Sequence, residues 1–120
     1  MKPFLHARSS VKQFGGKPED YQDIHDFIDS SKAHHPDVRH RALFHSSLGC
    51  YLVEQIFGIT RFNSDGREYS TRDIAEHHII EDLGKIPTVS DYLNEMTIQK
   101  WMSARESKIR KLEYKKENVD

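Results

Sequence analysis

The chain has 120 residues, which suits a single domain with a modest hydrophobic core. Charged residues make up 31% of it and the net charge is −1, which argues against a general nucleic-acid or membrane binder. Its one cysteine, Cys50, rules out an intrachain disulfide and a cysteine metal cluster, and fits a reducing, cytoplasmic location. No apolar run has the length of a membrane span.

The N-terminal half of the chain is expected to contain two helices. Residues 1–17 lack helical periodicity and are expected to be irregular. Pro18 is typical of a first helical turn, and the first helix is expected to fade near 32–35. Asp37 is a plausible N-cap for a second helix, which should run without a break to Gly58.

The second half begins with a hairpin signal. Two short segments, Ile-Thr-Arg-Phe at 59–62 and Arg-Glu-Tyr at 67–69, flank the turn sequence Asn-Ser-Asp-Gly at 63–66. Ser70 resembles the start of a capping box for a third helix, which Gly84 should end.

A short fourth helix is expected to follow Thr88, and Trp101 and Met102 are expected to complete the core. Residues 1–102 are therefore predicted to form one mainly α domain, a compact bundle of four to five helices with one short β-hairpin. Residues 103–120 are predicted to form a charged helix or tail. The net charge is about −4 over residues 1–97 and about +3 over residues 98–120, so the tail could dock on a second subunit of a homo-oligomer.

Three of the eight histidines, His25, His45 and His78, lie on apolar stripes of the predicted helices. Each has a charged partner one helical turn away in the sequence: Asp29 for His25, Arg41 for His45 and Asp82 for His78. Burying so many polar groups is costly unless they are paired or liganded. We therefore expect the three imidazoles to converge on a site between the first three helices.

The chain also resembles a family of small uncharacterised phage and bacterial proteins. The segments that carry the resemblance, in order, are HARSS at 6–10, FGGKPEDY at 14–21, RHRAL at 39–43, EQIFG at 54–58, NSDG at 63–66 and EDLGKIP at 81–87. The resemblance covers roughly residues 5–102. It implies a bacterial or phage origin and a cytosolic location, and brings no established activity.

One interpretation of the histidines is a metal centre. His78 and Asp82 lie four residues apart, as do His77 and Glu81, so each pair shares a helical face. With His45, these groups would give a histidine and carboxylate shell suited to zinc, iron or manganese. The alternative is that these pairs are only helix-surface or buried hydrogen bonds.

A second interpretation is a pocket for a phosphorylated molecule. Arg39 and Arg41 fall in the first turns of a predicted helix, whose N-terminal N–H groups favour anions. The candidate ligand-binding residues are Arg8, Ser9, His25, Lys32, Arg39, His40, Arg41 and His45. The alternative is that the arginines pair with nearby aspartates on the surface.

Two functions of different classes follow, beside a purely structural or partner-binding role. The first is a small binding protein that captures a phosphorylated small molecule or nucleotide. Because of the phage resemblance, capture of a nucleotide immune signal would make it an anti-defence protein. The second is a metal-dependent phosphoester hydrolase, in which His25, His45, His78 and Asp82 hold the ion and Glu81 or Glu54 activates water. The sequence favours a protein that is not an enzyme.

Overall fold

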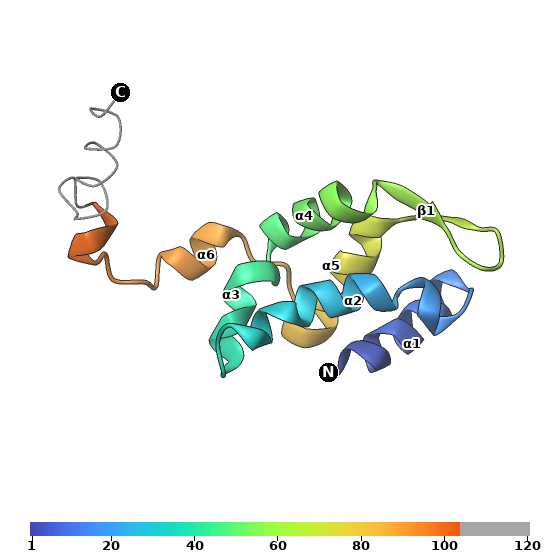
Figure 1. Cartoon of the computed structure of the whole chain (residues 1–120), viewed down its shortest axis with the longest axis horizontal. Helices are drawn as coiled ribbons and strands as arrows, with labels where there is room; N and C mark the ends of the chain where they lie inside the picture. The colour runs from blue at the N-terminus through green and yellow to red at the C-terminus, as the bar shows by residue number, and fades with distance from the viewer. Residues whose placement is uncertain (104–120) are drawn as a thin grey trace, which may run out of the picture.

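The computed structural model describes residues 1–103, which form six α-helices and one two-stranded antiparallel sheet (Figure 1). The helices are α1 (Pro3–Phe14), α2 (Gln22–Asp29), α3 (Arg41–Phe44), α4 (Ser47–Phe57), α5 (Thr71–Leu83) and α6 (Val89–Leu93). The strands are β1 (Thr60–Phe62) and β2 (Glu68–Ser70). Short 3₁₀ turns lie at Pro18–Asp20, Ser30–Ala33, Val38–His40 and Lys100–Met102. The predicted mainly α fold with one hairpin is confirmed.

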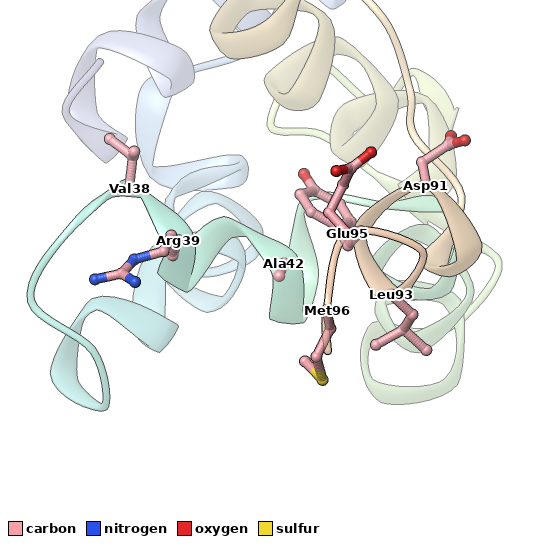
Figure 2. A pocket seen from close by; sticks show the side chains of 8 residues that line it. Val38, Arg39, Ala42, Asp91, Leu93, Glu95 and Met96 are labelled. Carbon is pink, nitrogen blue, oxygen red and sulfur yellow. The ribbon is translucent and has the colours of Figure 1, made fainter. Parts of the chain in front are cut away.

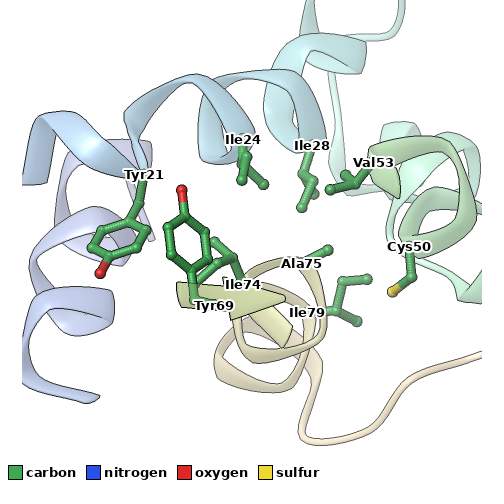
Figure 3. Packing of buried hydrophobic residues seen from close by; sticks show 9 residues of the cluster. All are labelled: Tyr21, Ile24, Ile28, Cys50, Val53, Tyr69, Ile74, Ala75 and Ile79. Carbon is green, nitrogen blue, oxygen red and sulfur yellow. The ribbon is translucent and has the colours of Figure 1, made fainter. Parts of the chain in front are cut away.

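The hydrophobic core lies between α2, α4 and α5 (Figure 3). On α2 and α4 the core residues are spaced three or four apart and form an apolar stripe, whereas the buried face of α5 also carries Thr71 and His78. The buried members are Tyr21, Ile24, Ile28, Cys50, Val53, Tyr69, Ile74, Ala75 and Ile79. Fully burying one large aliphatic side chain contributes about 1.5–3 kcal/mol. This core fixes α2 and α5 side by side, which matters for the polar site that they share.

The expectation that residues 1–17 are irregular is wrong. Pro3 occupies the first turn of α1, and the helix ends at Gly15, whose φ of 82° suits glycine. The buried face of α1 consists of His6, Ala7 and Ser10. Because this face is polar, an apolar pattern could not reveal it.

The predicted continuous helix from Asp37 to Gly58 is also wrong, because the chain breaks at His45. There the backbone leaves the helical region, with φ −85° and ψ 63°. Ser46 then caps α4 by accepting a hydrogen bond from the Gly49 backbone N–H at 3.4 Å. The break turns His45 into the interior, where it is completely buried.

The predicted hairpin is present, and Thr60 pairs with Ser70 in its antiparallel register. The predicted Thr88 capping box is present, whereas Ser70 makes no side-chain cap to α5. The expectation that Trp101 and Met102 complete the core is wrong, because they are 72% and 43% exposed. In Figure 1 the segment after α6 runs away from the helical body.

The predicted charged helix or tail after residue 103 lies outside the described residues. Within residues 1–103, no helix has both the length and the apolar character needed to cross a membrane.

Candidate metal centre

Four buried side chains from three parts of the fold bring their ligand atoms to one point. Asp29 ends α2, His45 lies at the break between α3 and α4, and His78 and Asp82 lie one turn apart on α5. One nitrogen or oxygen of each residue lies within 4.8 Å of those of the other three. The set of two imidazoles and two carboxylates is one that zinc, iron or manganese accepts.

The four nitrogen-to-oxygen distances between these residues are compatible with a four-coordinate metal site. His45 Nε2 lies 3.0 Å from Asp82 Oδ2 and 3.5 Å from Asp29 Oδ1. His78 Nε2 lies 3.2 Å from Asp29 Oδ1 and 3.3 Å from Asp82 Oδ2. Zinc bonds to nitrogen and oxygen of about 2.0–2.1 Å give a tetrahedron with edges of about 3.3–3.4 Å. An ion could therefore enter with small adjustments of the side chains.

The charges in the centre favour a cation. Burial alone would raise the pKa of Asp82, but hydrogen bonds from His78, the Met1 amino group and His45 hold it below its usual value. Burial lowers the pKa of His45 to about 4, so this ring is neutral near pH 7. The pKa of His78 is raised, because its bonds to Asp29 and Asp82 outweigh the effect of burial. The cluster therefore pairs two carboxylates with a single imidazolium, that of His78. The proton on its Nε2, shared with Asp29 and Asp82, occupies the place that a metal ion would take.

Two atoms of the cluster are left without a hydrogen bond. Asp29 Oδ2 and His45 Nδ1 are buried and have no partner in the structure. An unpaired buried polar atom typically costs about 1–3 kcal/mol, so a cluster held only by hydrogen bonds is incompletely satisfied. Asp29 Oδ2 is free to act as a second oxygen ligand.

Behind the centre, a chain of hydrogen bonds orients His78. His78 Nδ1 lies 2.8 Å from Nδ1 of the buried His25, whose Nε2 lies 2.8 Å from the Ser10 hydroxyl. That hydroxyl in turn donates to the His6 carbonyl at 3.1 Å. His6, His25 and His78 form a second group with metal-ligand geometry. Because the hydrogen bond between His25 and His78 already uses the Nδ1 atoms of both rings, we assign His25 to orienting His78, which is a ligand of the centre described above.

Comparison with known proteins places the chain in a family. The model of a domain of unknown function, DUF6915, matches residues 1–102. The chain belongs to the DUF6915 family. Neither the curated proteins nor the solved structures gave a match.

A partly exposed polar group lies beside the buried centre of this DUF6915 domain. Glu81 Oε1 lies 2.9 Å from His6 Nδ1, and Ser9 donates to Glu81 Oε2 at 2.7 Å. His6 Nε2 reaches to 3.2 Å from Asp82 Oδ1 without forming a hydrogen bond. His77 adjoins Ser9, at 3.0 Å from its hydroxyl. His6 therefore lies between Glu81 at the surface and Asp82 in the centre.

The residues predicted to bind a phosphate are spread over the DUF6915 domain. Of these, His25 and His45 lie in or beside the buried cluster. Arg39 is on the surface, where its guanidinium pairs with Asp37 at 2.6 Å. His40 is buried and bonds to the Ser31 hydroxyl at 2.8 Å.

The other cationic candidates also lie apart. Arg8 projects from α1 over the ring of Phe4, and Lys32 and Arg41 belong to the segments flanking His40. Binding of a phosphorylated molecule stays a prediction.

The sequence pairs Asp29 with His25 but does not predict Asp29 as a metal ligand, and it does not predict that His6 and Ser10 support the centre. Asp29 follows His25 by four residues, which places the two on one face of α2. His6 and Ser10 have the same spacing on α1. That shared polar spacing is the signal that could have found them.

Proposed function

We propose that this chain binds one divalent transition-metal ion through Asp29, His45, His78 and Asp82. The observation that carries the proposal is the convergence of four ligand atoms within 4.8 Å, with four nitrogen-to-oxygen distances of 3.0–3.5 Å that are compatible with a four-coordinate site. Zinc, iron(II) and manganese(II) are the ions that this ligand set favours.

The ion would act first as a structural link. Its ligands come from the end of α2, from the α3–α4 break and from α5, which the hydrophobic core already brings together. Four protein ligands in a buried position are typical of structural rather than catalytic sites. Binding to the folded state alone stabilises it by about 4 kcal/mol at a free metal concentration 1,000 times the Kd.

The proposal is tested on protein purified without a histidine tag. Elemental analysis is expected to find about one transition-metal ion per chain, and chelator should lower the melting temperature, with Zn²⁺ restoring it. Co²⁺ in place of Zn²⁺ should give the visible absorption of a four-coordinate site. A folded protein that contains no metal, and whose melting temperature Zn²⁺ and Co²⁺ leave unchanged, contradicts the proposal.

Matched asparagine variants separate the centre from general charge effects. Asp82→Asn keeps the shape of the side chain and removes the anionic ligand, so we expect metal content to fall well below one per chain. Asp26→Asn makes the same chemical change on the exposed side of α2 and should leave metal content unchanged.

A second candidate function is hydrolysis of a phosphoester at the same centre. It is favoured by a shallow surface depression of about 240 Å³ lined by Ser9, Lys12, Gln13 and His77, next to Glu81. Lys12 and His77 could hold phosphate oxygens, and Glu81 could accept a proton from water. Manganese- or zinc-loaded protein should then hydrolyse bis(p-nitrophenyl) phosphate, and Glu81→Gln should abolish turnover while keeping the metal. Loaded wild-type protein without turnover would leave only the structural role.

A further inference from the structure

An apolar groove opens between the segment of Val38–His40 and α3 on one side and α6 on the other (Figure 2). Its volume is about 600 Å³, and its lining residues are Val38, Arg39, Ala42, Asp91, Tyr92, Leu93, Glu95 and Met96. Figure 2 shows the carboxylates of Asp91 and Glu95 on one side of the α6 segment, with Leu93 and Met96 on the other. The groove thus combines an apolar floor with an acidic edge.

The segment that leaves this groove carries large apolar side chains into solvent. We call residues 97–103 the arm. Within it, Ile98 is 82% exposed and Trp101 72% exposed. Trp101 is the single tryptophan of the chain. Exposed aromatic residues of this size typically anchor an interface.

The arm does not fill the groove of its own chain. Met96 itself lines the groove, and the chain then runs outward from the helical body (Figure 1). Ile98 and Trp101, which follow it, are exposed and are not among the lining residues of the groove. The exposed apolar groove and the exposed apolar arm therefore both lack a partner among residues 1–103.

The charges of the groove and of the arm indicate which partner fits both surfaces. The groove presents the carboxylates of Asp91 and Glu95, and its one basic lining residue, Arg39, is already paired with Asp37. Lys100, in contrast, precedes Trp101, and the sequence from 98 to 120 has a net charge of about +3. The arm of one copy is thus complementary to the groove of another in both apolar and charged character. A two-fold axis would let both arms exchange at once and close the assembly.

We propose that two copies of this chain form a dimer in which the arm of each inserts Ile98 and Trp101 into the groove of the other. Lys100 then lies near the acidic edge of that groove. The proposal concerns a surface separate from the metal centre and does not depend on it.

The fluorescence of Trp101, the single tryptophan of the chain, reports directly whether the arm is docked. Excited at 295 nm, wild-type protein in the micromolar range should emit at shorter wavelength than in urea, and dilution should shift the emission to longer wavelength. Light scattering after gel filtration should show a dimer that dissociates over the same concentrations. A monomer whose tryptophan emits as in urea overturns the proposal. A monomer with short-wavelength emission also overturns it, because the arm would then be covered within one chain.

Substitutions at exposed positions test the arm and the groove of the proposed interface separately. Ile98→Ser in the arm and Val38→Glu in the groove should each weaken dimerisation by at least about tenfold. Phe62→Ser is the control, because Phe62 is 68% exposed on the hairpin, and should leave the dimer unchanged. All three positions are exposed, so the fold should survive, and circular dichroism confirms it. If Phe62→Ser dissociates the dimer and the other two do not, the interface is elsewhere.

Mixing two defective chains distinguishes exchange of arms from other dimers. Trp101→Ala keeps an open groove without a fluorophore, and Val38→Glu keeps an intact arm beside a blocked groove. Adding the first to the second should shift the emission of Trp101 to shorter wavelength as one arm docks. An unchanged spectrum with both proteins folded contradicts arm exchange.

Discussion

His25 and His78 meet through like atoms, with Nδ1 of one ring 2.8 Å from Nδ1 of the other. A hydrogen bond between them needs one N–H and one lone pair, so only one ring carries a proton there. Burial, followed by the neighbouring His78 and His6, lowers the pKa of His25 to about 2. His25 therefore accepts from His78, and its own Nε2–H points to Ser10. This arrangement leaves His78 Nε2 as the atom that faces Asp29 and Asp82.

The first prediction follows from this orientation of His78. Replacing His25 by leucine removes the acceptor for His78 Nδ1–H but leaves all four proposed ligands. We expect the affinity for Zn²⁺ to fall by about 10–100-fold, which is typical when a ligand loses its supporting hydrogen bond. Competition with a chromophoric chelator measures it. His25→Asn, whose amide oxygen can accept, should recover part of the loss.

A control on an exposed histidine completes this test. His34→Leu changes the same residue type at the surface, and the affinity should be as in the wild type. Equal affinities for His25→Leu, His25→Asn and the wild type would contradict a positioning role for His25.

The second prediction concerns acid stability after metal removal. The pKa of His45 is lowered to about 4, while in the unfolded chain it is near 6.5. Below pH 6.5 the unfolded state therefore binds more protons than the folded state, and stability falls as the pH drops. His45 alone accounts for about 3 kcal/mol between pH 7 and pH 4. His25 acts in the same direction, whereas the raised pKa of His78 opposes it.

Urea unfolding of chelator-treated protein at pH 7, 6 and 5 checks this expectation. The free energy of unfolding should decrease at each step, and His34→Gln should reproduce the wild-type curve. A stability that is constant over this range would mean that the folded and unfolded chains take up equal numbers of protons, and it would contradict the lowered pKa values of His45 and His25.

Much of the fold can be predicted from the sequence because regular helices form its hydrophobic core. Ile24 and Ile28 on α2, and Ala75 and Ile79 on α5, are four residues apart and so follow the helical period. The hairpin is likewise encoded locally, by the Asn-Ser-Asp-Gly turn.

The polar interior is harder to foresee, because it depends on contacts between distant segments. The face of α1 that packs inward carries His6 and Ser10, which hydrophobic periodicity does not register. The break at His45 arises where Ser46 caps a new helix inside a continuous apolar pattern. Trp101 was expected in the core by its size alone, and the structure places it in solvent.

A third prediction concerns the reactivity of Cys50. Burial, followed by the nearby Glu76, raises the pKa of the Cys50 thiol to about 11. The reactive thiolate is therefore scarce at pH 8, and the side chain is completely buried. Ellman's reagent should leave the native protein unmodified and should titrate one thiol per chain in guanidinium chloride. Rapid reaction of the native protein would show that α4 opens readily.

The fourth prediction concerns Asn63, which joins the hairpin to the first two helices. Its amide nitrogen donates to the Phe14 carbonyl at 3.0 Å and to the Tyr21 hydroxyl at 3.2 Å. Its amide oxygen accepts from the backbone N–H groups of Asp65 and Arg67, both at 3.0 Å. Asn63→Asp keeps the shape but sets a carboxylate oxygen against the Phe14 carbonyl. We expect it to lower the free energy of unfolding by about 2–4 kcal/mol, and by more than Asn63→Ala does.

Urea titration of the two variants measures this order. Ser64→Ala is the control, because Ser64 is exposed on the same turn and its hydroxyl bonds only to Asp20, so it should cost less than about 1 kcal/mol. If Asn63→Asp is as stable as the wild type, the amide is not the connection between the hairpin and α1. If Asn63→Ala costs more than Asn63→Asp, the two backbone N–H groups of the turn contribute more than the bonds made by the amide nitrogen.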